Sequence, residues 1–129
     1  MKRRPLIGLV VPDLGQGGGV SAVARFVKDA IVRSGSYEMR LVSLSTASND
    51  PCSVRLFAPL TWIRGVSTAH GAWEMLPYSQ VGVMLGEFEF QRYRPRAALT
   101  RVLADCDLIQ VVSGSPAWAN AVVGLGRPV

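Results

Sequence analysis

Hydrophobic positions change their spacing along the N-terminal third of the chain, and each spacing predicts an element. Residues 6–11 form an uninterrupted apolar run, typical of a strand buried on both faces of a parallel sheet. Apolar residues then recur at helical spacing over 20–31, opposite charged ones, and Gly35 follows, so we expect an amphipathic helix there. Residues 39–45 alternate apolar and polar side chains and predict a second strand. Strand, loop, helix and strand in this order predict a βαβ unit.

The same alternation returns near the C-terminus. Residues 95–104 carry one apolar stripe and predict a helix, and residues 107–112 predict another buried strand. Ser115 is suited to cap a following helix over 117–123, with Pro116 at its first position. We expect Gly124 or Gly126 to end that helix.

The middle of the chain gives weaker signals. Residues 46–53 are polar and predict a loop, and residues 54–57 are a candidate short strand. Residues 81–85 are a second candidate strand, whereas residues 87–93 fit either a strand or a helix. Glycine and proline interrupt the remaining apolar pieces of this region.

Together these elements predict a single α/β domain of 129 residues, a Rossmann-like parallel sheet flanked by helices. Residues 127–129 look like the approach to one more strand, so we expect the sheet to be incomplete at the C-terminus. A strand edge meant to be central would then be exposed, which predicts low solubility or self-association.

The composition fits a folded domain, with 49% hydrophobic and 18% charged residues. The longest apolar run is far shorter than the roughly 20 residues of a spanning helix. Pro12 and Asp13 interrupt it too early for a secretory signal, so we expect a cytoplasmic location. The two cysteines, Cys52 and Cys106, form no C-x-x-C pair and His70 is alone, so we expect buried thiols and no metal site.

Basic residues exceed acidic ones, giving a formal net charge of +5 and a pI near 9.9. Arginines at 92, 94, 96 and 101 form one cluster, and residues 2–4 form another. Such a balance attracts phosphates on nucleic acid, on anionic lipid or on a sugar nucleotide, although it also serves solubility alone. No nucleic-acid-binding motif accompanies the charge, so we expect no nucleic-acid partner. Peripheral contact with a membrane remains a candidate.

A glycine-rich loop, Gly15-Gln16-Gly17-Gly18-Gly19, lies between the first strand and the first helix. Glycines let backbone amides approach a phosphate, and a helix start adds partial positive charge, although the loop also fits a flexible turn. Gly17 to Ala22 formally fits the dinucleotide fingerprint G-x-G-x-x-[GA]. However, the turn is too long for that fingerprint, and no acidic residue follows the second strand to hold a ribose. A Walker A motif is absent, which excludes a P-loop triphosphatase.

A second candidate site, Ser113-Gly114-Ser115, follows the strand predicted at 107–112. Two hydroxyls and a glycine at a strand end suit a polar ligand such as a sugar. Plain helix capping explains Ser115 equally well.

Three stretches, taken in order, resemble the N-terminal domain of family 4 glycosyltransferases, which have two Rossmann-like domains in the GT-B arrangement. The first is the opening strand with the turn through Gly18-Gly19 and the helix after it. The second is the strand Asp107-Leu108-Ile109-Gln110-Val111-Val112-Ser113-Gly114, and the third is Gly126-Arg127-Pro128-Val129, similar to the family's G-x-P-V. Residues 51–85 match weakly.

The resemblance implies that Gly17, Gly18 and Gly19 contact the diphosphate of a nucleotide-sugar donor, and that this domain binds a sugar or lipid-linked acceptor. Ser113 and Gly114 are then candidate acceptor contacts. The resemblance places no catalytic residue, metal or cofactor in this chain. It implies a C-terminal donor-binding domain that the chain lacks, so we expect the chain alone to be inactive.

Two departures from the family's pattern concern the site. Val20, Ser21 and Ala22 stand where a Glu-Arg-like segment often follows the glycine pair, and Gln110 and Val112 replace an H-x-H pattern. The alternative function is a stand-alone, non-catalytic nucleotide- or phosphate-binding module. An oxidoreductase domain is disfavoured because no acid is placed to hold the ribose.

Overall fold

The computed structural model describes residues 2–14, 18–46 and 50–129. Its five strands form one sheet in the order β3-β4-β2-β1-β5, in which β3 alone is antiparallel to its neighbour. The strands are β1 (Leu6–Pro12), β2 (Glu38–Leu44), β3 (Thr68–Trp73), β4 (Leu76–Val81) and β5 (Leu108–Val111). The predicted α/β, Rossmann-like fold is therefore confirmed, with the refinement that the sheet is mixed.

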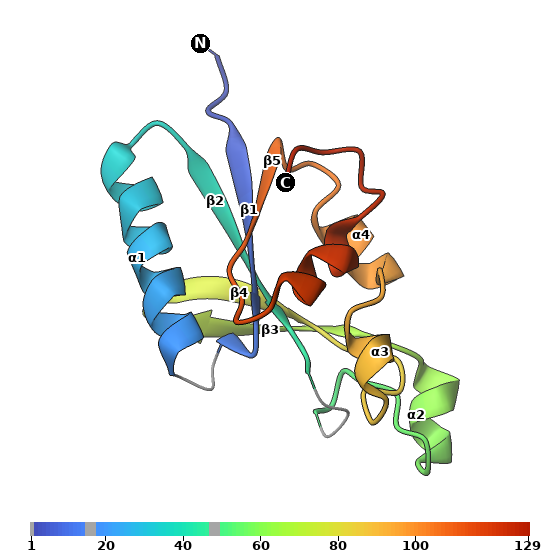
Figure 1. The fold of residues 1–129 in the computed structure, drawn as a ribbon. Helices are drawn as coiled ribbons and strands as arrows, with labels where there is room; N and C mark the ends of the chain where they lie inside the picture. The colour runs from blue at the N-terminus through green and yellow to red at the C-terminus, as the bar shows by residue number, and fades with distance from the viewer. Residues whose placement is uncertain (1, 15–17, 47–49) are drawn as a thin grey trace.

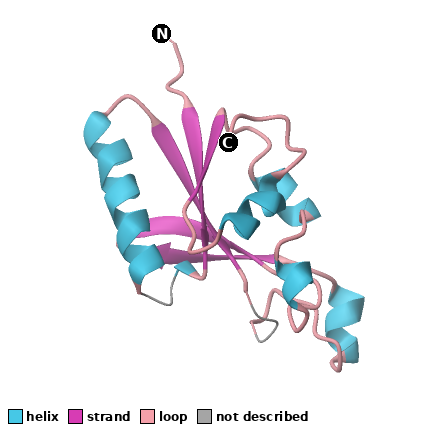
Figure 2. Cartoon of the chain, in the orientation of Figure 1, coloured by secondary structure: helices cyan, strands magenta, loops and turns pink. Residues whose placement is uncertain are grey.

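Helices lie on both sides of this sheet (Figures 1 and 2). They are α1 (Gly19–Ser34), α2 (Pro59–Arg64), α3 (Glu89–Arg92), α4 (Ala97–Val102) and the 3₁₀ helix η2 (Pro116–Val122). Helix α1 packs on one face, whereas α4 and η2 pack on the other. None of the helices among the described residues is both long and apolar enough to cross a membrane.

Strand β1 lies inside the sheet because it pairs with β2 on one side and β5 on the other. Six of its seven residues are buried, as its continuous apolar run predicts. Gly8 permits close packing there, because a Cβ at this position would lie 2.7 Å from Leu103 Cδ2. Helix α1 ends where predicted, at Gly35 in the left-handed conformation, whose N–H donates to Val32 O.

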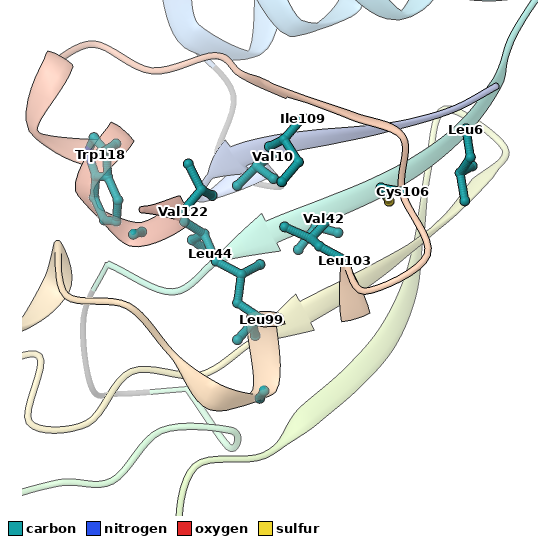
Figure 3. Close-up of a cluster of buried hydrophobic side chains, with 13 residues drawn as sticks. Leu6, Val10, Val42, Leu44, Leu99, Leu103, Cys106, Ile109, Trp118 and Val122 are labelled. Atoms are coloured by element: carbon teal, nitrogen blue, oxygen red, sulfur yellow. The ribbon is translucent and has the colours of Figure 1, made fainter. Parts of the chain in front are cut away.

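Side chains alternate between two apolar cores, one on each face of the sheet. The α1 face holds Leu9, Val11, Leu14, Ala24, Leu41 and Val112. On the other face, leucines and valines of β1, β2 and α4 meet Trp118 of η2 (Figure 3). Trp118 also contacts Tyr93 edge-on, with their ring centroids 4.9 Å apart. This division is what the two-residue period of a strand produces.

The middle of the chain differs most from the sequence-based expectations. The strand expected at 81–85 lies earlier, at β4, which forms a hairpin with β3 that the sequence did not predict. Residues 54–57 form no strand and contribute a single bridge, from Val54 to Met84. The ambiguous segment 87–93 contains the short helix α3.

The hairpin escaped prediction because its turn lacks the usual residues. Trp73 pairs with Leu76, so Glu74 and Met75 form a two-residue turn with φ of 48° and 66°. Such turns require positive φ at both positions and usually contain Asn-Gly or Asp-Gly. A glutamate and a methionine therefore give no turn signal.

Strand β5 is where predicted but is less buried than expected. Within it only Ile109 is buried, and Leu108 is 38% exposed, because β5 has one strand partner in the sheet. Beyond it, Ile109 N–H donates to Pro128 O at 2.8 Å, so Pro128 lies beside β5.

Candidate functional site

The order of the strands places a topological switch point beside β1. The chain passes from β1 through α1 to β2 on one side, whereas α4 leads to β5 on the other side. Connections that diverge in this way leave a switch point at the carboxyl ends of the strands, where open α/β sheets bind ligands. At this point the loop after β5, which contains Ser113 and Gly114, lies beside the first turn of α1.

Gly18 and Gly19 begin helix α1 and are exposed. Gly18 is the N-cap with φ of 91° and ψ of −168°, a conformation that essentially only glycine adopts. Among the described residues, no atom lies within 4 Å of the Cβ position of either glycine, which leaves room for a ligand to approach their backbone. No described side chain caps the helix and no acidic residue occupies its first turn, so nothing in the described part of the chain compensates its partial positive charge. Gly17, the third predicted contact, lies outside the described residues.

The second segment lies against the first. A Cβ at Gly114 would be 3.6 Å from Val20 Cγ2, so this glycine faces the first turn of α1. Ser113 donates its hydroxyl to Ser115 O at 2.7 Å. Ser115 accepts from Ala117 N–H at 3.2 Å, which confirms its predicted role as a cap. Because the hydroxyls of Ser113 and Ser115 are used within the turn, Gly114 is the residue of this segment that makes no such hydrogen bond.

Asp13 is a residue that the sequence analysis did not include in the site. It follows β1 with φ of 46°, unusual outside glycine, and its N–H donates to Leu44 O at 2.9 Å. Its carboxylate accepts a hydrogen bond from the hydroxyl of Thr46, which follows β2. The position of Asp13 directly after a buried strand could have identified it as a candidate from the sequence. Asp13 thus presents a carboxylate at the same edge as Gly18.

Buried serines fix the chain where it leaves β1. Leu14 N–H donates to the Ser43 hydroxyl at 3.0 Å, and Leu14 O accepts from the Ser21 hydroxyl at 3.2 Å. Both serines are buried, so these bonds are shielded from water. They tie the chain at the end of β1 to β2 and to α1.

Arg96 is a buried cation that the sequence analysis had assigned to a surface cluster. It is 7% exposed, and its guanidinium donates to Ser45 O, Val81 O, Gly82 O and Arg92 O at 2.8–3.1 Å. Its Nε has no partner in the described part of the chain. Burial lowers the pKa of Arg96 to about 10, opposed by the negative charges of Asp50 and Asp13, so it stays charged at neutral pH.

The remaining candidates for chemistry are two cysteines and one histidine. Cys52 and Cys106 are buried free thiols, as expected, and burial raises the pKa of both. His70 is exposed on β3, with Nδ1 3.4 Å from the Ser79 hydroxyl. Within residues 2–14, 18–46 and 50–129 no three metal-ligating side chains gather.

Comparison of the chain with protein-family models, with curated proteins and with solved structures gave no match. The arrangement at the switch point is therefore the basis for a functional assignment. It offers exposed backbone amides, the positive end of a long helix and one carboxylate, which suits recognition of an anionic group beside hydroxyls.

Proposed function

We propose that this domain is the acceptor-side, Rossmann-like half of a glycosyltransferase that transfers a hexosyl unit from a nucleotide sugar. The observation that carries the proposal is the contact between the loop after β5 and helix α1, where Gly114 lies against Val20 beside the exposed start of α1. In this assignment Gly18 and Gly19 face the donor diphosphate, and the Ser113–Gly114 turn faces the acceptor.

The chemistry explains why an open helix start is useful. Departure of a nucleoside diphosphate builds negative charge, which preorganised amides and a helix dipole stabilise. Such stabilisation needs both walls of a cleft, so the donor-binding domain of the proposed enzyme would close over this edge. The acceptor is a sugar or a lipid-linked sugar, and the latter would bring the domain to a membrane surface.

Binding of a nucleoside diphosphate to the 129-residue chain tests the proposal. Uridine diphosphate, titrated in a two-dimensional amide NMR experiment, is expected to bind weakly, in the millimolar range, and to shift the amides of Gly18, Gly19 and Gly114. Uridine, which lacks the phosphates, is expected to leave them unchanged. Shifts confined to other parts of the domain would exclude the proposed site.

Gly19→Ala gives the matched variant. The Cβ position is open and φ is ordinary, so the fold should persist and α1 should gain slightly in stability. The added methyl group blocks close approach of a phosphate, and we expect at least tenfold weaker binding. Ala30→Ser adds one atom at an exposed site of the same helix and should bind like the unmodified chain.

The alternative function, a stand-alone phosphate-binding module, is favoured by the uncompensated start of α1, which needs no second domain to attract an anion. Affinity separates the two assignments. A complete module should bind a nucleotide or phosphate in the micromolar range, whereas one wall of a cleft should not.

A further inference from the structure

We propose that a pocket between α3, α4 and the segment that follows α2, distinct from the glycine-rich loop, binds a phosphate monoester that carries an apolar body. The pocket has a volume of about 380 Å³, within the usual range of small-molecule sites. Its wall combines the side chains of Arg94, Arg96 and Arg101 with apolar groups. This site is independent of the proposed glycosyl transfer.

Positive charge in the pocket is not balanced by its own lining. Three of the lining residues are arginines and none is acidic. Among the described residues, no carboxylate forms a salt bridge with any of these arginines. Arg94 and Arg101 are exposed, and the one side-chain bond of Arg94 is a long one of 3.4 Å to Gln91 Oε1. Two guanidinium groups therefore remain available to a ligand, and each can bind a phosphate through two parallel hydrogen bonds.

Arg96 adds a third, fixed positive charge to the lining of the pocket. Its guanidinium is held by four backbone carbonyls and cannot turn to solvent. A phosphate bound by Arg94 and Arg101 would lie near this third cation, inside a site whose walls exclude part of the water. The attraction is larger there than on an open surface.

The apolar part of the wall defines the rest of the ligand. Val66, Met84, Pro95 and Ala97 line the pocket and offer no side-chain hydrogen bond. A bare phosphate would leave these surfaces in water, whereas an ester with an apolar body would cover them. The lining of the pocket thus favours a phosphate ester over inorganic phosphate and over a neutral apolar molecule.

Binding of phenyl phosphate to the 129-residue chain tests the proposal. In amide NMR titrations we expect phenyl phosphate to shift residues 91–101 and to bind at least fivefold more tightly than inorganic phosphate or phenol. Equal affinities for phenyl phosphate and phenol would overturn the proposal. So would shifts at Gly18 and Gly19 without shifts at 91–101, and this outcome leaves the glycosyltransferase proposal standing.

Three variants locate the binding within the pocket. Arg94→Gln and Arg101→Gln should each weaken phenyl phosphate binding about fivefold or more, since both residues are exposed and their loss leaves the fold intact. Ala97→Leu, also at an exposed position, fills the pocket and should abolish phenyl phosphate binding. The control is Arg33→Gln, which removes an exposed charge at the far end of α1. An equal loss with Arg33→Gln would show attraction by net charge alone and would overturn the proposal.

Two sources can supply such an ester, a soluble metabolite or a lipid head group. Vesicles of phosphatidylcholine with and without phosphatidic acid distinguish them in a flotation assay. Binding to phosphatidic acid that phenyl phosphate displaces identifies a lipid, and phenyl phosphate binding without vesicle binding identifies a soluble ester. Vesicle binding that persists in Arg101→Gln, together with no phenyl phosphate binding, would assign the exposed apolar residues of α2 as the contact and would overturn the proposal.

Discussion

Strand β1 and the β3–β4 hairpin belong to the same sheet, yet they are held in it by different interactions. Strand β1 buries six of its seven residues between two apolar cores. Strand β3 buries none, and β4 buries only Val81. Apolar burial therefore stabilises the centre of the sheet, whereas the hairpin contributes few buried side chains.

Trp73, Leu76 and Tyr78 of the hairpin pack only partly buried against the α1-facing core, and individual polar contacts add to this packing around the hairpin. Asp50 accepts from Cys52 N–H and from the Ser53 hydroxyl, and Ser53 in turn accepts from Val83 N–H at 2.9 Å. Arg96 binds the carbonyls that follow β2 and β4. Apolar burial thus contributes most in one region of the sheet, and individual hydrogen bonds contribute most in the other. The following variants test the two contributions separately.

The largest expected effect comes from Leu9→Ala in β1. Leu9 is fully buried in the α1-facing core, and its truncation should lower the free energy of unfolding by about 3–5 kcal/mol through lost burial and a cavity. Urea unfolding measures this change. Met75→Ala in the hairpin turn is the control, since Met75 is 98% exposed and its truncation should change stability by less than about 0.5 kcal/mol. Similar losses in both variants would contradict the contrast between the regions.

Ser53→Ala should have a smaller and more local effect. The substitution leaves Val83 N–H buried without its partner, at a cost of about 1–3 kcal/mol. We expect hydrogen exchange to accelerate at Val83 and its neighbours while the β1 amides keep their protection. Ser36→Ala, at an exposed turn, is the control. Equal acceleration throughout β1 would show that the two regions open as one unit.

The smallest effect concerns a polar contact of β1 itself. Asp107 has a lowered pKa, first because its carboxylate accepts Leu6 N–H at 2.8 Å and then because Arg3 lies 3.1 Å away. A lowered pKa stabilises the fold above the ordinary value of 3.8, and this contribution is lost as the pH falls through the folded pKa.

Melting temperatures of the unmodified chain and Asp107→Asn measure this contribution. Their difference should be small and constant above about pH 5 and should shrink below about pH 4. A difference that stays constant down to about pH 2 would show that the charge of Asp107 does not stabilise β1.

The contrast also explains what the sequence could predict. Strand β1 and helix α1 were predicted within one or two residues, because apolar burial imposes a period on the sequence. The same holds for β2, and for the capping of η2 by Ser115. The hairpin was not predictable because Glu74 and Met75 give no turn signal. The role of Arg96 was not predictable because a hydrogen bond to one backbone atom imposes no period.

The candidate site divides in the same way. Gly18 and Gly19 were identifiable from their place between a strand and a helix, and the strand order brings Gly114 beside Val20 in the first turn of that helix. Ser113 stabilises its turn through one hydrogen bond, and Ser43 anchors the chain after β1 through another. Neither is visible in a residue pattern.

The turn at Glu74 and Met75 shows why an unfavourable residue can persist. Glu74 has a left-handed backbone that glycine or asparagine would adopt more easily. Its carboxylate, however, forms salt bridges with Arg25 and Lys28 of α1, and both cations lie 5.9 Å from the centre of the Trp73 ring. Replacing Glu74 with glycine would ease the backbone and release the hairpin tip from the helix. Glu74 thus strains the backbone of the turn but attaches the hairpin to α1. A substitution chosen only to improve the turn would loosen this edge of the sheet.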